Sequence, residues 1–232
     1  MKQDIDILGG VMQKAQEIYW ISFQVDIVTK LTVSSLALAI FRTKFDDQDN
    51  WPIHIPNRNE DTFIRRGYYG GHADTYIPRG ENLFYYDVNS LYPYIIQSYN
   101  MPGGKPVWHG KLQDRDLDNL VGFIEAYVEC PETITRPFLP YRCEKTKVLI
   151  FPTGKFCGVY YSEELKYARQ IGYKIIPLHG YLFENKNSTP FEGFVLEVFQ
   201  KRQEANKLQK NAMSYVYKIL MNSLYGRFGI QP

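Results

Sequence analysis

The spacing of apolar residues changes along this chain, and that change limits the possible folds more than any other feature. Apolar side chains recur close to every 3.6 residues between Asp4 and Phe45, and the helical pattern returns from about Pro190 to Gly226. The stretch Val121–Pro177 instead alternates short strand-like runs with Pro and Gly. Helices at both ends with short strands between them predict a mixed α+β fold.

Local signals refine this expectation for the helices. The apolar, Ser- and Ala-rich run Leu31–Ile40 predicts a buried helix, and the Ile7–Ile40 helices as a whole are expected to serve packing. Ser162–Gln170 begins with Ser followed by two Glu, which indicates a capped helix. Near the C-terminus we expect a helical hairpin, with one helix to about Lys207 and a second from about Asn211 to Tyr225.

Strands and connections are predicted from shorter signals. Tyr68–Tyr76 predicts a turn into a strand, and Tyr173–Phe183 predicts a pair of strands. Asn82–Val88 is strongly apolar and aromatic, and we expect a buried strand there with Asp87 at its end, followed by a turn. Lys44–Arg66 is charged, contains Pro and Asn, and reads as a linker.

Composition excludes several classes of protein. The net charge of +2 over 232 residues is too small to demand a nucleic-acid partner, although 19 tyrosines would suit surfaces that stack on bases. The three cysteines, Cys130, Cys143 and Cys157, lack the spacing of a zinc site or a disulfide framework. No apolar run is long enough to cross a membrane, and the acidic start is unlike a secretory signal or transit peptide.

The first chemically suggestive motif is YYDVNSLYP, which contains Asp87. A carboxylate at the end of a buried strand is held rigidly and could bind Mg²⁺, with the backbone carbonyl of Val88 as a second ligand. Tyr92, braced by Pro93, could pack under the sugar of a nucleotide and exclude a 2′-hydroxyl. The alternative is a strand that ends in Asp and runs into an ordinary turn.

The second motif is KILMNSLYGRFG, near the C-terminus. On a helix its Lys218, Asn222, Tyr225 and Gly226 fall on one face, within roughly 100° of one another. A cation, an amide, an aromatic ring and a bare backbone make a poor hydrophobic seam, but they could meet a triphosphate and a nascent base pair. The alternative is a helix with an extended surface lysine and a C-terminal glycine cap.

These motifs resemble those of a known family. YYDVNSLYP resembles the first carboxylate motif of family B DNA polymerases, and KILMNSLYG is similar to their K-x-x-x-N-S-x-Y-G fingers motif, in the same order. The Tyr-Tyr-Gly-Gly run at 68–71 resembles the Y-x-G-G element of the protein-primed branch, found in linear mitochondrial plasmids and some phages. The resemblance implies a partial polymerase palm with an antiparallel sheet, a β-rich insertion and a helical fingers hairpin.

The resemblance also divides the chain into regions and implies partners. Residues 1–66 would be a remnant of the exonuclease-domain edge with a linker, and 67–102 the N-terminal palm with the first carboxylate motif. Residues 103–189 would be the insertion that contacts the terminal protein and DNA, and 190–232 the fingers helices. The implied partners are template and primer DNA, a dNTP and a terminal priming protein, with no membrane, in the mitochondrion.

Roles for single residues follow from the resemblance as well. The metal ligands for a two-metal Mg²⁺ site would be Asp87, also the catalytic carboxylate, and the carbonyl of Val88. Nucleotide binding would fall to Ser90, Leu91, Tyr92, Arg202, Lys218, Asn222 and Tyr225. DNA binding would fall to Tyr68, Tyr69, Gly70, Gly71 and Gly226.

The chain departs from the family pattern in several places. The D-T-D motif that supplies the second metal carboxylate does not occur in it, and a D-x-E exonuclease motif is also absent. Where the family has a Lys one turn after the triphosphate-binding Arg, Asn206 stands here, with Lys207 displaced by one step. Tyr69 replaces the usual Ser or Thr of Y-x-G-G.

Three hypotheses follow from these departures. The chain is a DNA polymerase segment that has little or no activity alone, a non-catalytic remnant that binds DNA, dNTP or a terminal protein, or the product of a decayed reading frame that does not fold. Whether a second chain supplies the missing palm carboxylates is left open.

Overall fold

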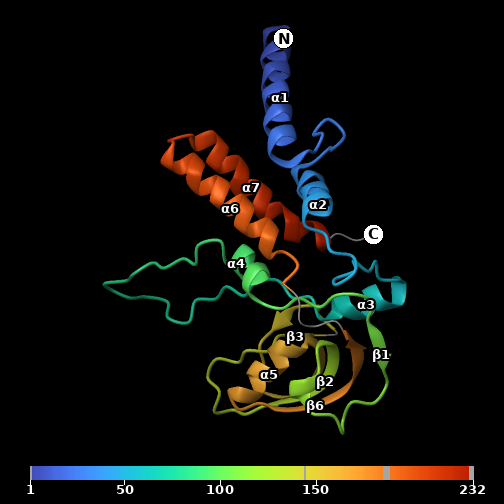
Figure 1. The fold of residues 1–232 in the computed structure, drawn as a ribbon. Helices are drawn as coiled ribbons and strands as arrows, with labels where there is room; N and C mark the ends of the chain where they lie inside the picture. Colours follow the sequence, from blue (N-terminus) through green and yellow to red (C-terminus); the bar gives the residue numbers. More distant parts are fainter. Residues whose placement is uncertain (1, 144, 185–188, 230–232) are drawn as a thin grey trace. The chain divides into compact units, whose positions relative to one another are not determined.

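The computed structural model describes residues 2–143, 145–184 and 189–229, which form two compact units (Figure 1). Unit 1 comprises Met1–Trp51, Tyr86–Met101 and Ser188–Pro232, and unit 2 comprises Pro52–Tyr85 and Pro102–Asn187. The chain therefore enters and leaves unit 2 twice. The four regions expected from the resemblance divide the sequence into polymerase domains, whereas the two units are compact bodies in space. The four regions therefore stay a prediction.

Unit 1 is helical throughout its regular structure. Its helices are α1 (Lys2–Phe23), α2 (Val33–Lys44), α4 (Leu91–Ser98), α6 (Glu192–Lys207) and α7 (Asn211–Phe228). Helices α6 and α7 lie side by side as an antiparallel hairpin (Figure 1). The tight turn between them places Gln209 in the left-handed region, at φ 55°, and the amide of Lys210 donates to the carbonyl of Ala205. The predicted helical hairpin is confirmed.

An aromatic cluster forms the core of unit 1. The ring of Phe191 lies 5.2 Å from that of Phe41 on α2 and 5.3 Å from that of Trp51, and Phe228 on α7 closes the group. Tilted and edge-to-face rings of this kind stabilise a core beyond the area they bury. The predicted buried helix at 31–40 is confirmed by α2, whereas the first turns of α1 are exposed, so the expected packing role of that segment is wrong there.

Unit 2 is built on an antiparallel sheet with the strand order β1-β6-β2-β5. The four strands are β1 (Val107–His109), β2 (Gly122–Cys130), β5 (Gly154–Tyr161) and β6 (Lys174–Leu182), and a small pair is formed by β3 (Tyr141–Arg142) and β4 (Leu149–Ile150). Along β2 every second residue is buried, as expected for a strand with one face on the core. The predicted α+β fold with an antiparallel sheet is confirmed.

The core of unit 2 lies under one face of this sheet. Helix α5 (Ser162–Gln170) buries Leu165 and Ala168 against Ile124 and Val128 of β2, and a short 3-10 turn, η1 (Leu117–Asn119), adds Leu117. The amide of Tyr161 donates to the Glu164 carboxylate at 3.1 Å, so the N-cap of α5 is Tyr161, one residue before the Ser162 that the sequence suggested. The predicted helix at 162–170 is otherwise confirmed.

The strand expected at 82–88 is wrong. Those residues form no regular structure, and Phe84, Tyr85 and Tyr86 are at least 80% exposed. A strand needs a neighbour to satisfy its backbone, and no strand in the described part of the chain pairs with this segment. Asp87 therefore lies on an extended segment rather than at the end of a buried strand.

Four other local expectations are also corrected. Residues 68–76 form no strand, and Tyr173–Phe183 contributes one strand, β6, rather than two. The linker contains a helix, α3 (Arg58–Arg66), because Asn57 caps its first turn and Glu60 closes the capping box. The turn after Asp87 is helix α4, which tolerates Pro93 because the first turn of a helix needs no amide donor.

Candidate functional site

Unit 1 contains a cavity of about 530 Å³ that brings together several of the residues selected from the sequence. Three segments supply its walls: the stretch before α4, one face of α6 and one face of α7. The lining residues are Asp87, Asn89, Ser90, Phe199, Arg202, Gln203, Asn206, Lys218 and Asn222. We call it the unit 1 cavity.

Helical spacing explains two of its walls. On α6 the contributors are Phe199, Arg202, Gln203 and Asn206, which recur every three or four residues and so share one face. On α7, Lys218 and Asn222 are one turn apart. Both helices also bury apolar side chains in the core, among them Val198 on α6 and Leu220 and Leu224 on α7, and this packing fixes the orientation of the polar residues at the cavity.

The third wall is held by an unusual backbone conformation. Ser90, the N-cap of α4, has φ 52° and ψ 46°, in the left-handed region that costs energy for a residue with a Cβ. Its carbonyl nevertheless accepts the Tyr94 amide at 3.0 Å, which starts the helix. This bend takes the chain from the extended segment at Asp87 into α4 and leaves both residues on the cavity wall.

The cavity is polar, and two of its buried atoms lack partners. Among the described residues Arg202 and Lys218 form no ion pair, so two cations face one carboxylate, Asp87. The Nε of Arg202 and the Oδ1 of Asn222 are buried without a hydrogen-bond partner. Buried polar atoms are usually satisfied, so a ligand with both donors and acceptors would complete this site.

Other predicted site residues lie beside the cavity rather than in its wall. The rings of Tyr92 and Tyr225 are 5.2 Å apart, so the two tyrosines selected from separate motifs contact each other in unit 1. Val88 and Leu91 are exposed and do not line the cavity. Gly226 is exposed, with open space where a Cβ would stand. The roles assigned to all of these residues stay predictions.

The sequence analysis missed part of the wall. Asn89, Phe199 and Gln203 were not selected, although Phe199 and Gln203 share the helical spacing of Arg202. That spacing was the available signal, because residues on one helix face tend to meet the same ligand.

A metal ion would find few ligands in this unit. Asp87 is the one carboxylate of the cavity wall, and the described residues hold no cluster of three or more His, Cys, Asp or Glu that could bind a metal. One carboxylate fits a Mg²⁺ ion that is held mainly by phosphate oxygens and water. It does not suffice for the expected site with two metal ions.

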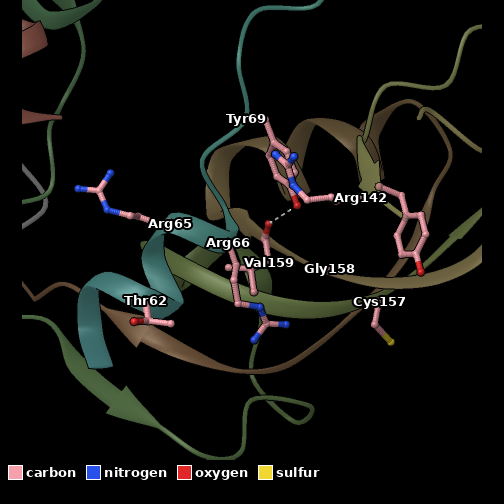
Figure 2. Close-up of a pocket in the computed structure, with 9 residues that line it drawn as sticks. Thr62, Arg65, Arg66, Tyr69, Arg142, Cys157, Gly158 and Val159 are labelled. Atoms are coloured by element: carbon pink, nitrogen blue, oxygen red, sulfur yellow. Dashed lines mark hydrogen bonds between the residues drawn. The ribbon is translucent and has the colours of Figure 1, made fainter. Parts of the chain in front are cut away.

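Unit 2 has a separate pocket of about 380 Å³ beside α3 and β5. It is lined by Thr62, Arg65, Arg66, Tyr69, Tyr141, Arg142, Cys157, Gly158 and Val159. Figure 2 shows the hydroxyl of Tyr69 donating to the carbonyl of Val159, a bond of 3.2 Å, with Arg142 beside the ring. Burial and the nearby Glu164 raise the pKa of Tyr69, so its hydroxyl stays protonated at neutral pH.

Three arginines make this pocket basic. The Nε of Arg65 donates to both carboxylate oxygens of Asp61 at 2.9 Å, and Arg66 donates to Glu125 at 3.0 Å. Arg142 forms no ion pair within the described residues and remains free for an anion. Of the predicted DNA-binding run, Tyr68 is 71% exposed, and Gly70 and Gly71 are exposed beside it.

None of the helices in the described ranges is both long and apolar enough to cross a membrane.

Comparison with known proteins places the chain in a family. The model of the family described as DNA polymerase type B, organellar and viral, matches residues 1–232. A probable DNA polymerase of Neurospora intermedia is 36% identical over 99% of the chain, and one of Agaricus bitorquis is 32% identical over 97%. The chain covers 24% and 29% of these relatives, so it spans about a quarter of their length.

Solved structures give the same result for the fold. Phi29 DNA polymerase aligns with a TM-score of 0.64 at 20% identity, covering 88% of this chain and 37% of the phage protein. Its complex with primer-template DNA and incoming nucleotide substrates aligns with a TM-score of 0.65 at 18% identity, covering 85% of this chain and 36% of that one. The resemblance seen in the motifs is confirmed: the chain belongs to the type B DNA polymerases of organelles and viruses.

Proposed function

We propose that this chain is the part of a DNA polymerase that binds the incoming dNTP. The observation that carries the proposal is the unit 1 cavity, where Asp87, Arg202, Lys218 and Asn222 converge from three segments. The reaction of the whole enzyme is attack of a primer hydroxyl on the α-phosphate, with pyrophosphate as the leaving group. Membership of the family supports that reaction.

In this proposal the cavity residues divide the work. Arg202 and Lys218 neutralise the triphosphate, and the buried Nε of Arg202, which lacks a protein partner, donates to it. The Oδ1 of Asn222, a buried acceptor without a protein partner, accepts a hydrogen bond from a donor group of the nucleotide. The paired rings of Tyr92 and Tyr225 border the sugar and the base. Asp87 and the backbone carbonyl of Val88 are the groups that would hold a Mg²⁺ ion. Bound Mg²⁺ would stabilise the charge that develops on the phosphate oxygens.

The unit 2 pocket supports a second part of the proposal, DNA binding. The basic wall of Arg65, Arg66 and Arg142 stands next to Tyr69, and Tyr68, Gly70 and Gly71 present exposed backbone and ring surface. Positive side chains of this kind hold phosphate backbones without reading sequence. Protein priming, a terminal-protein partner and a mitochondrial location belong to the same proposal. The Tyr-Tyr-Gly-Gly run at 68–71 supports the first two, and the family description of organellar and viral enzymes supports the third.

A binding experiment tests the main proposal. The fluorescence anisotropy of a labelled dNTP is measured with the whole chain, in EDTA so that no metal is needed. Lys218→Ala should weaken binding about tenfold or more, because a charge-assisted contact contributes roughly 1.5–3 kcal/mol. Lys210→Ala, a lysine outside the cavity wall, should leave the affinity unchanged. Equal affinities for Lys218→Ala and the wild type would contradict the proposal.

A second candidate function is binding without catalysis. The observation in its favour is that Asp87 is the one carboxylate of the cavity wall. A primer-extension assay with Mg²⁺ or Mn²⁺ separates the two candidates. We expect little or no extension by this chain alone, together with dNTP binding that survives Asp87→Asn and fails with Lys218→Ala. Robust extension would contradict that expectation and would favour the polymerase over binding without catalysis.

A further inference from the structure

Helix α6 presents two neighbouring residues of different charge near its end, Asn206 and Lys207. Asn206 lies one turn after Arg202 and lines the unit 1 cavity. Lys207 is rotated from it by about 100° around the helix axis, is exposed and is not part of the cavity wall. The polar residue that lines the cavity one turn after Arg202, Asn206, is therefore neutral.

The charge of the cavity is small beside that of a triphosphate. Arg202 and Lys218 supply two positive charges, and Asp87 supplies one negative charge. A nucleoside triphosphate carries about four negative charges at neutral pH, because each phosphate has a strongly acidic oxygen and the last has a second that titrates near pH 6. A positive charge added at position 206 would therefore neutralise more of the charge of the triphosphate.

We propose that Asn206 sets the affinity of the cavity for the triphosphate, standing beside it as a neutral hydrogen-bonding group, and that Lys207 contributes no charge there. This inference rests on the proposed function of the cavity. Its structural basis is the shared face of Arg202 and Asn206 on α6, opposite Lys218 and Asn222 on α7.

The chemistry of an amide supports this role. An asparagine side chain offers one acceptor oxygen and two donor hydrogens, so it can bond to a phosphate oxygen without adding charge. The ionised acceptor strengthens this bond, but the amide brings no positive charge to offset that of the triphosphate. A site of this kind binds a free triphosphate weakly. Its affinity rises when a divalent cation binds together with the nucleotide and offsets the charge of the phosphates.

Two opposite substitutions test the proposal in the full chain. The dissociation constant of a fluorescent dNTP is measured by anisotropy in EDTA and again in excess Mg²⁺. In EDTA, Asn206→Lys should tighten binding about tenfold and Asn206→Asp should weaken it by a similar factor. A unit charge next to the triphosphate changes the binding free energy by roughly the amount that corresponds to a tenfold change in affinity. Both effects should shrink in Mg²⁺ and at high salt.

Lys207→Ala is the matched control, since it removes a charge one position away. Its affinity should equal that of the wild type. The proposal is overturned if Asn206→Lys and Asn206→Asp change the affinity in the same direction or not at all, or if Lys207→Ala weakens binding as much as Asn206→Asp does. Circular dichroism verifies that each variant keeps its helices; Asn206 is exposed, so a change of side chain there is tolerated.

Failure of the proposed function gives a different result. In that case the wild-type chain binds no dNTP in either buffer. The Asn206→Lys variant then acquires no specific affinity for the triphosphate and binds inorganic sulfate as tightly. A wild type that binds dNTP while the Asn206 variants behave alike overturns only the present inference.

Discussion

At the scale of single residues, the core of unit 2 accommodates a buried polar group by a hydrogen bond. Tyr160 is fully buried, and its hydroxyl donates to the carbonyl of Pro140 at 2.6 Å. Burial raises the pKa of this phenol far above its usual value, so the hydroxyl stays protonated and remains a donor at neutral pH. The bond ties β5 to the loop before β3.

Removing that hydroxyl should destabilise unit 2. Tyr160→Phe leaves the Pro140 carbonyl buried without its donor, which costs about 1–3 kcal/mol. Urea denaturation followed by circular dichroism measures the change. Tyr127→Phe, on the outward-facing side of β2, is the control and should change the stability by less than about 0.5 kcal/mol. Equal effects of the two substitutions would contradict the role given to the buried bond.

Glu164 gives a pH-dependent prediction. Burial raises the pKa of its carboxyl above the usual value for a glutamate, so the folded state disfavours the ionised form. The stability contributed by this group is complete below the unfolded pKa and is lost as the pH rises through the folded pKa. Glu164→Gln keeps an acceptor for the Tyr161 amide and cannot ionise. It should therefore melt above the wild type at pH 7, with the difference shrinking toward pH 4; a constant difference would contradict this.

Residue by residue, the sequence predicted the cavity in part. Lys218 and Asn222 were found because helical spacing places them on one face, and Asp87 because a carboxylate at the end of an expected strand, in a motif that resembles the family's first carboxylate motif, suits a metal ion. Phe199 and Gln203 were missed because their positions on α6 fit an ordinary surface helix equally well. Their role depends on what α7 and the segment before α4 place opposite them, and that is a tertiary property.

At the scale of elements, local signals decided which predictions succeeded. The capping box of α5, the periodicity of α6 and α7 and the turn between those two helices are local signals, so the three helices were located closely from the sequence. The segment 82–88 has the composition of a strand, but pairing is non-local, and composition cannot supply a partner. Helix α3 was hidden because its charged sequence resembles a linker, although its capping box was present.

Pairing between β2 and β6 leads to a test at this scale. Gly180 lies opposite Ile124, and a Cβ there would overlap the Phe123 carbonyl oxygen. Gly180→Ala should therefore force the two strands apart and cost more than about 2 kcal/mol. Gly110→Ala is the control, because its Cβ would meet nothing nearer than 3.7 Å. Thermal melting of both variants checks this, and a Gly180→Ala protein as stable as the control would refute the close approach.

At the scale of the whole molecule, each unit has its own spectroscopic reporters. Of the three tryptophans, Trp20 and Trp51 belong to unit 1 and Trp108 belongs to unit 2. Trp108 is 47% exposed, so it can be replaced without opening a core. A Trp108→Phe variant therefore reports the unfolding of unit 1 by its fluorescence.

Nucleotide binding should stabilise unit 1 through the cavity. In the Trp108→Phe variant, dNTP at about 100 times its dissociation constant should add about 2.7 kcal/mol to the free energy of unfolding seen by fluorescence. Adding Lys218→Ala, which should weaken binding about tenfold or more, should reduce this gain to about 1.4 kcal/mol or less at the same dNTP concentration. An unchanged gain would mean that the nucleotide binds elsewhere. A broad, non-cooperative melt of the wild type would favour the decayed-gene hypothesis instead.

The interleaving of the two units limits how this gene could be shuffled among relatives. The coding stretch for 102–187 carries every strand of unit 2, yet α3 and Tyr69, which pack against β5, are encoded upstream of the 86–101 excursion into unit 1. A chimera that exchanges only the later stretch would join a foreign sheet to a native helix and a native tyrosine. Viable hybrids must therefore inherit both coding blocks from the same parent.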